Sequence, residues 1–231
     1  MNTITERLLH VRAQLTKAAA EYGRETASVA LLAVSKTRPV EDIIAALGAG
    51  QRDFGENYLQ DAIPKIQALP DREAVWHFIG PIQSNKTRQI AEHFHWVHSV
   101  DRLKIAQRLS DQRPEGLPPL NVCLQVNISQ DPAKSGLNPA EVFDVAEEVQ
   151  RLPGLRLRGL MTIPAESHSL AEQRQPFHAM RELFEALQQK GFALDTLSMG
   201  MSDDMEAAIA EGATMVRIGT AIFGQRLPRK E

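Results

Sequence analysis

Short apolar segments alternate with helical segments along the chain, and this alternation constrains the fold more than any other feature. A helical pattern over residues 4–22 stops at Gly23 and is followed by the apolar run Leu31-Leu32-Ala33-Val34, which predicts a buried strand. Further strands are predicted at residues 53–55, 76–79, 96–98, 121–127, 159–162, 196–199 and 215–218. Helical patterns alternate with them at residues 41–47, 57–68, 85–92, 102–112, 139–151, 171–189 and 203–211.

This pattern predicts an α/β fold in which eight parallel strands close into one (β/α)8 TIM barrel. An open doubly wound sheet is the alternative, because strand order cannot be determined from one sequence. The proline-rich segment 113–119 is the stiffest break, but its length suits a loop before the fifth strand. We therefore expect residues 1–231 to form a single domain.

Composition and charge exclude several classes of function. The 231 residues are 43% hydrophobic with a formal net charge of −3, which argues against a nucleic-acid partner because such proteins need a basic face. The N-terminus does not resemble a signal peptide, and no apolar stretch approaches the roughly 18 residues that span a bilayer. We expect a cytoplasmic protein that does not contact membranes. Cys123 has no disulfide partner within the chain and is expected to be a buried thiol.

Lys36 follows the first predicted strand directly, in Ala33-Val34-Ser35-Lys36. In a β/α barrel the active site lies where the strands end. A lysine at this rim is partly desolvated, which lowers the pKa of its amine, and only the neutral amine attacks an aldehyde. A solvated lysine in a strand–helix loop is the alternative, and the tetrapeptide alone favours it.

The last predicted strand ends in Arg217-Ile218-Gly219-Thr220. Gly219 lets backbone N–H groups approach a phosphate closely and Thr220 adds a hydroxyl, and the loops after strands seven and eight are the usual phosphate seat of such barrels. Arg217 is a candidate hydrogen-bond donor to the ligand. Taken singly, Gly219 is equally compatible with an ordinary turn and Arg217 with a salt bridge.

Ser202 lies between the seventh strand and the following helix, in Met199-Gly200-Met201-Ser202-Asp203-Asp204. Its hydroxyl could cap that helix or contact a phosphate, and capping is favoured for the residue by itself. Asp203 and Asp204 are expected to point outward, since they would repel an anion. Strand one neighbours strand eight in a closed barrel, so a nucleophilic amine and an anion site would lie side by side. A phosphorylated aldehyde needs this arrangement.

Several segments together resemble the pyridoxal 5′-phosphate (PLP) homeostasis protein family, also called the YggS/PROSC family. The resemblance runs from near residue 30 to the C-terminus, through the segments Ala33-Val34-Ser35-Lys36, Phe54-Gly55-Glu56-Asn57, 77–86, 159–164, 197–204 and 216–220. It implies the barrel of the alanine racemase N-terminal domain, with PLP held as a covalent aldimine on Lys36. It also implies that Arg217 faces the pyridine nitrogen. By the same resemblance, phosphate contacts come from Ser202, Gly219 and Thr220, and Asn57 lies beside the cofactor.

This implied site favours cofactor binding over catalysis. An arginine opposite the ring nitrogen does not readily donate a proton, so the ring is a weak electron sink. Racemisation also needs a second acid/base group. In the racemases that group comes from an additional β-domain and a partner subunit, and this chain has no residues left for such a domain. We expect a non-enzymatic protein that buffers or delivers PLP and so influences amino-acid and keto-acid metabolism.

Other possibilities stay open at this point. A small PLP-dependent amino-acid racemase is the main alternative, and a Schiff-base aldolase without PLP is a weaker one. A delivery role implies PLP-dependent apoenzymes as transient clients. A monomer is expected because the domain that builds the racemase dimer is absent.

Two further features carry weaker signals. Lys134 could exchange with PLP near the barrel mouth, although a solvated loop lysine is favoured. His77, His93, His95 and His98 lack a metal-ligand spacing, so surface or packing histidines are expected rather than a metal site.

Overall fold

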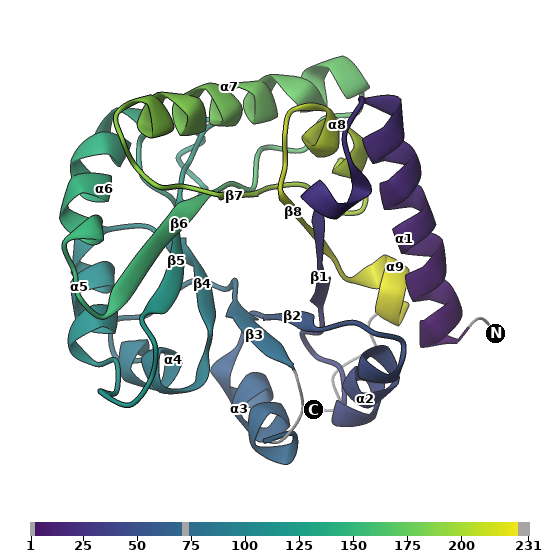
Figure 1. Ribbon diagram of the computed structural model, residues 1–231, viewed down its shortest axis with the longest axis horizontal. Helices are drawn as coiled ribbons and strands as arrows, with labels where there is room; N and C mark the ends of the chain where they lie inside the picture. Colours follow the sequence, from purple (N-terminus) through teal and green to yellow (C-terminus); the bar gives the residue numbers. More distant parts are fainter. Residues whose placement is uncertain (1–2, 71–73, 226–231) are drawn as a thin grey trace.

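Eight parallel strands form the centre of the molecule and close into a barrel (Figure 1). The computed structural model describes residues 3–70 and 74–225. Consecutive strands are neighbours, and β8 pairs with β1 to complete the closure. The predicted TIM barrel is confirmed, and the open doubly wound alternative is wrong. The strands are β1 Ala30–Val34, β2 Asp53–Glu56, β3 Val75–Phe78, β4 Trp96–Val100, β5 Leu120–Gln125, β6 Leu155–Met161, β7 Thr196–Ser198 and β8 Met215–Ile218.

Helices surround the barrel, and each predicted helix is present with ends shifted by a few residues. They are α1 Ile4–Glu21, α2 Val40–Gly48, α3 Leu59–Ala68, α4 Thr87–His93, α5 Leu103–Asp111, α6 Val142–Gln150, α7 Leu170–Gln189 and α8 Met205–Ala210. The segment predicted as a helix at 139–151 begins as a 3₁₀ turn, Pro139–Glu141, before α6. A second 3₁₀ turn, Thr26–Ser28, and the short helix α9, Thr220–Phe223, were not predicted.

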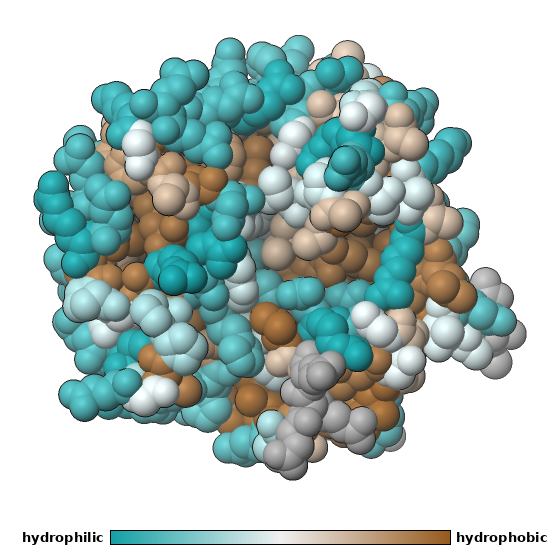
Figure 2. All heavy atoms as spheres, viewed as in Figure 1, coloured by the Kyte–Doolittle hydropathy of each residue, from teal (hydrophilic) through white to brown (hydrophobic). Residues whose placement is uncertain are grey.

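The core lies between the barrel and the helices, and apolar periodicity accounts for it. Helix α7 buries Phe177, Met180, Phe184 and Leu187, which recur at the spacing that places side chains on one helix face. Helix α1 lies beside α9 at the edge of the barrel, where the Arg7 side chain donates to the Ile222 carbonyl at 2.6 Å (Figure 1). Figure 2 shows hydrophilic residues over most of the outer helices and apolar residues gathered between them. The polypeptide therefore holds the strand ends on a rigid, packed frame.

The structure also bears on Cys123 and on membrane-spanning helices. Cys123 is buried, as expected, and burial raises the pKa of its thiol to about 12. Within residues 3–70 and 74–225, no helix combines the length and apolar character needed to cross a bilayer.

Candidate functional site

Lys36 lies at the carboxyl end of β1, in a turn that is tied to the neighbouring strand. The Ser35 N–H donates to the Gly55 carbonyl at 2.9 Å, which continues the β1–β2 pairing beyond the end of β1. The Arg38 N–H then donates to the Ser35 carbonyl at 3.1 Å and closes the turn. Lys36 itself is half-buried. The sheet therefore fixes the backbone that carries the amine, and the half-buried position of Lys36 agrees with the partial desolvation expected for a lysine at this rim.

A buried ion pair beneath this turn was not predicted from the sequence. Glu56 Oε1 accepts a hydrogen bond from the Ser35 hydroxyl at 2.6 Å and from Lys65 Nζ at 2.8 Å. Lys65 Nζ also donates to the Ser35 carbonyl at 2.9 Å. Burial raises the pKa of the Glu56 carboxyl, and the Lys65 ammonium opposes that shift. The pair holds Ser35 in place through both its hydroxyl and its carbonyl.

Asn57 follows β2 and carries a buried acceptor that has no hydrogen-bond partner among the described residues. That atom is Oδ1. Buried polar atoms of this kind are uncommon in proteins and call for an explanation, one being a ligand that supplies the missing donor. Gly80 packs against the Asn57 backbone so closely that a Cβ at position 80 would lie 2.1 Å from the Asn57 oxygen. The structure therefore places Asn57 rigidly at the mouth of the barrel.

Gly219 and Thr220 follow β8, next to the end of β1. Ala33 pairs with Ile218, and a Cβ on Gly219 would lie 3.3 Å from the Val34 carbonyl oxygen. The predicted adjacency of the first and last strands is confirmed. Thr220 is exposed and begins α9, so its hydroxyl is accessible at the same rim as Lys36.

Ser202 is exposed in the turn after β7, and the capping interpretation is wrong. Helix α8 begins at Met205, and its N-cap residue is Asp204. Asp203 is exposed, as expected. The same expectation is wrong for Asp204, which is half-buried and whose Oδ1 accepts a hydrogen bond from the Met201 N–H. The sequence could not decide which residue of Ser202-Asp203-Asp204 caps the helix, because both Ser and Asp favour that position.

Arg217 is buried inside the barrel, where its hydrogen bonds go to uncharged oxygens. Its guanidinium donates to Ser198 Oγ at 3.0 Å and to the Thr162 carbonyl at 2.9 Å. The salt bridge considered as an alternative is thus not what holds it. Burial lowers the pKa of Arg217 to about 10, a value at which the guanidinium stays charged at neutral pH.

Ser198 connects Arg217 to a row of polar side chains inside the barrel. Ser198 Oγ lies 2.9 Å from His98 Nδ1, His98 Nε2 lies 2.9 Å from His77 Nδ1, and His77 Nε2 lies 3.0 Å from Asp53 Oδ1. We call these four residues, together with Arg217, the lumen chain. It begins at Asp53, the first residue of β2, and ends at the opposite, carboxyl end of the strands. The sequence offered one signal for it, polar residues inside apolar strands.

His93, His95 and Lys134, which were also considered from the sequence, lie outside the lumen chain. His93 contacts the Gln89 carbonyl, and His95 Nδ1 accepts the Trp76 N–H. Residues 3–70 and 74–225 contain no cluster of three or more His, Cys, Asp or Glu side chains that could hold a metal ion. Lys134 is half-buried rather than fully solvated, and its ammonium donates to the Pro164 carbonyl at 2.8 Å, just beyond β6.

Lys36, Asn57, Ser202, Gly219 and Thr220 thus follow the carboxyl ends of β1, β2, β7 and β8, and Arg217 lies inside β8 near the same end. In a closed parallel barrel these strand ends form one rim. The site combines a rim lysine, an orphaned amide oxygen, accessible hydroxyls and a buried cation. This set can hold a ligand that has a carbonyl, a polar ring and an anionic group.

Comparisons with known proteins agree with this description. The sequence profile of the alanine racemase N-terminal domain matches residues 10–227. The pyridoxal phosphate homeostasis protein of Pseudomonas aeruginosa is 61% identical over 226 residues, covering 98% of this chain and 97% of that protein. The protein of the same name from Escherichia coli (strain K12) is 54% identical over 229 residues, covering 98% of each chain.

Solved structures show the same fold. PipY of Synechococcus elongatus PCC7942, solved with PLP bound, is 40% identical and superposes with a TM-score of 0.84 over 96% of this chain and all of PipY. Alanine racemase of Clostridium difficile is 15% identical with a TM-score of 0.72, and the match covers 93% of this chain but only 56% of the racemase. The latter likeness shows the barrel alone. This chain therefore belongs to the pyridoxal phosphate homeostasis protein family, built on the barrel of the alanine racemase N-terminal domain.

Proposed function

We propose that this protein binds PLP at the carboxyl rim of its barrel and serves PLP homeostasis, with Lys36 as the covalent anchor. The observation that carries the proposal is the position of Lys36, half-buried after β1 and beside the β8 end that carries Gly219 and Thr220. The PLP-bound structure of the relative PipY supports the ligand. In the proposed linkage, Lys36 Nζ bonds to the aldehyde carbon, and the aldehyde oxygen leaves as water.

The residues around Lys36 fit such a ligand. PLP supplies an aldehyde that condenses reversibly with amines and a pyridine ring that withdraws electrons. Gly219, Thr220 and Ser202 would hold the phosphate through backbone N–H groups and hydroxyls. Arg217 would direct a guanidinium N–H at the ring nitrogen, and the orphaned Oδ1 of Asn57 would accept a hydrogen bond beside the ring.

We further propose that the protein stores or delivers the cofactor and has no catalytic turnover of its own. A guanidinium at the ring nitrogen would leave the ring a poor electron sink, and the match to alanine racemase covers only 56% of that enzyme. The relatives named above carry names that denote homeostasis, not a reaction. A single barrel domain over residues 1–231, acting as a monomer with PLP-dependent apoenzymes as transient clients, is part of the proposal.

The direct test is to locate the modified lysine. Purified protein is incubated with PLP, its visible absorbance is recorded, and borohydride reduction followed by peptide mass mapping identifies the labelled residue. We expect the label on Lys36 and its loss in Lys36→Ala, with the matched control Lys17→Ala, an exposed amine on α1, labelled like the parent protein. A colourless protein, or a label confined to Lys134, would refute the assignment.

The homeostasis role needs a separate test. Loaded protein is mixed with a PLP-dependent apoenzyme, and recovery of that enzyme's activity is followed while free PLP is trapped by excess amine. If the apoenzyme recovers activity faster than PLP released into solution could account for, the result supports delivery by direct contact. A chiral assay with the common amino acids tests the racemase alternative, and turnover on the order of 1 s⁻¹ that requires Lys36 would replace the proposal.

A further inference from the structure

The lumen chain runs from one end of the barrel to the other. Asp53 is the first residue of β2, His77 and His98 lie in the interiors of β3 and β4, and Ser198 ends β7. The strands are parallel, so the start of β2 lies at the end of the barrel opposite Lys36. The side chains between these ends are fully buried, since His77, His98 and Ser198 are 0% exposed.

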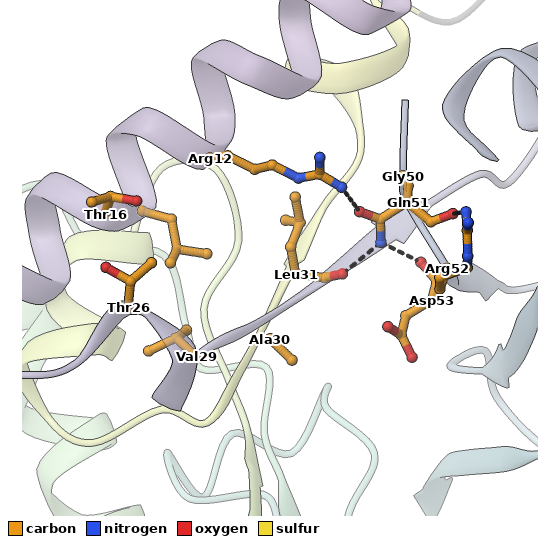
Figure 3. Close-up of a pocket in the computed structure, with 11 residues that line it drawn as sticks. Arg12, Thr16, Thr26, Val29, Ala30, Leu31, Gly50, Gln51, Arg52 and Asp53 are labelled. Atoms are coloured by element: carbon orange, nitrogen blue, oxygen red, sulfur yellow. Dashed lines mark hydrogen bonds between the residues drawn. The ribbon is translucent and has the colours of Figure 1, made fainter. Parts of the chain in front are cut away.

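Among the residues of the lumen chain, only Asp53 is exposed to solvent. Its side chain is 34% exposed. It borders a pocket of about 410 Å³ that is lined by residues from α1, the start of β1 and the loop before β2. Figure 3 shows the Asp53 carboxylate directed away from the Gln51 amide, while Gln51 is engaged with the Leu31 carbonyl and Arg12. The outer end of the chain is therefore open to solvent, and its inner end is the guanidinium of Arg217.

When both histidines are neutral, the hydrogen bonds of the lumen chain allow only one assignment of donors and acceptors. A carboxylate only accepts, so His77 Nε2 carries a proton and donates it to Asp53. His77 Nδ1 is then an acceptor, so His98 Nε2 carries the proton between the two rings. His98 Nδ1 is in turn an acceptor, so the Ser198 hydroxyl donates to it.

The remaining step joins this order to Arg217. A guanidinium only donates, and Ser198 Oγ accepts its N–H while giving its own proton to His98. The chain is thus a directed series of donors from Arg217 to Asp53, with a cation at one end and an anion at the other. Desolvation lowers the pKa of His77 and lowers the pKa of His98 still further, which agrees with neutral rings.

We infer that Asp53, His77, His98 and Ser198 are positioning residues that fix and polarise Arg217, so that Asp53, at the far end of the barrel, tunes how the bound cofactor's ring is held. This inference rests on the proposed function, because it takes Arg217 to face the ring nitrogen. Hydrogen bonds in a series polarise one another, and this chain ends in two charges whose partners lie out of water. Removing the Asp53 carboxylate would allow either ring nitrogen of His77 and of His98 to carry the proton. The Ser198 oxygen would then hold the Arg217 guanidinium less firmly.

The tautomers give a test in the parent protein that needs no substitution. Nitrogen-15 NMR of the histidine side chains distinguishes a protonated ring nitrogen from an unprotonated one. We expect His98 and His77 each to carry one proton, on Nε2. A proton on Nδ1 of His98, or a doubly protonated ring at neutral pH, would overturn the directed chain.

The second test links the chain to the cofactor through Asp53→Ala and Ser198→Ala. We expect each to bind PLP about three- to tenfold more weakly, the range set by one hydrogen bond, and to move the maximum of the visible absorbance band. Ser198→Thr keeps the hydroxyl and should restore both properties. Thr16→Ala, which lies in the same pocket outside the chain, is the matched control. Circular dichroism confirms that each variant is folded.

The outcomes separate this inference from the proposed function. If the parent protein takes no borohydride label on Lys36, the proposed function fails and this inference fails with it. If Lys36 is labelled and both alanine variants match the parent in affinity and absorbance maximum, only the inference is wrong. A band shift that Thr16→Ala also shows would likewise reject it, because the effect would then belong to the pocket.

Discussion

Lys65 Nζ, on α3, lies 2.8 Å from Glu56 Oε1, at the end of β2, and the pair contacts the turn that carries Lys36. Both side chains are almost completely removed from water, with exposures of 8% and 0%. The same ammonium holds the carbonyl of Ser35, the residue before Lys36. The Lys65–Glu56 pair therefore contributes to the stability of the barrel and also fixes the backbone next to Lys36.

Lys65→Met is therefore expected to destabilise the protein by about 3–5 kcal/mol, because it leaves the Glu56 carboxylate buried without its cation. Urea denaturation followed by circular dichroism measures the change. The double variant Lys65→Met/Glu56→Gln should recover most of the loss, since no uncompensated charge remains. Lys17→Met, an exposed residue of α1, serves as the control. A loss below about 1 kcal/mol in Lys65→Met would mean that the pair is not needed to neutralise Glu56.

Gly200→Ala is expected to cost more stability than Gly191→Ala. Both glycines have left-handed backbones, with φ of 93° and 94°, so both substitutions carry a similar backbone penalty of about 1 kcal/mol. A Cβ on Gly200 would also lie 2.5 Å from the Ala208 Cβ, whereas a Cβ on Gly191 meets nothing within 4 Å. The extra contact should add about 1–3 kcal/mol, measured as the difference between the two urea midpoints. Equal losses would show that α8 moves aside freely.

Much of this site follows from the sequence because it depends on local order along the chain. Lys36 was predicted from its place after a buried strand, and its closeness to Gly219 follows once eight strands are assumed to close. Helix α9 was missed because four residues are too few to show periodicity. The lumen chain was missed for a different reason. His98 and Ser198 are 100 positions apart, and only the strand register brings them together.

The acid dependence of stability should reflect the buried histidines. Burial lowers the pKa of His77, His95 and His98, so the folded protein binds fewer protons than the unfolded chain, whose histidine pKa is about 6.5. Their contribution is complete above that value and is lost as pH falls below it, by up to about 1.4 kcal/mol per pH unit for each histidine. The urea midpoint should therefore decrease as the pH is lowered from about 6.5 to 5.5, in a series measured from pH 8 to pH 5.5.

A matched variant assigns this dependence to the barrel interior. His98→Gln removes one of the shifted groups and should give a shallower fall between pH 6.5 and pH 5.5, whatever its stability at pH 8. Burial raises the pKa values of Glu56, Asp101 and Asp204, which acts in the opposite direction as pH falls. These carboxyls are present in both proteins, so the difference between the two profiles reports the histidine. Parallel profiles for the parent and His98→Gln would contradict the assignment.

Thr220→Val tests the phosphate side of the proposed site. Valine keeps the shape of threonine and removes the hydroxyl at the rim beside β1. A hydrogen bond to a charged group contributes about 1.5–3 kcal/mol, so PLP should bind at least about tenfold more weakly. Pyridoxal, which lacks the phosphate, should bind the parent and the variant equally. Absorbance titrations with the two compounds measure both affinities, and Thr220→Ser, which retains the hydroxyl, should behave like the parent.

The comparison of the two ligands makes the result specific. An equal loss for PLP and pyridoxal would mean that Thr220 shapes the rim without contacting phosphate, because a phosphate contact can affect only the phosphorylated compound. Thr16→Val, an exposed residue of α1 at the other end of the barrel, controls for a general effect of threonine replacement. If only PLP binding weakens, the anion lies against the end of β8, and Lys36, which follows the neighbouring strand β1, is the amine next to it.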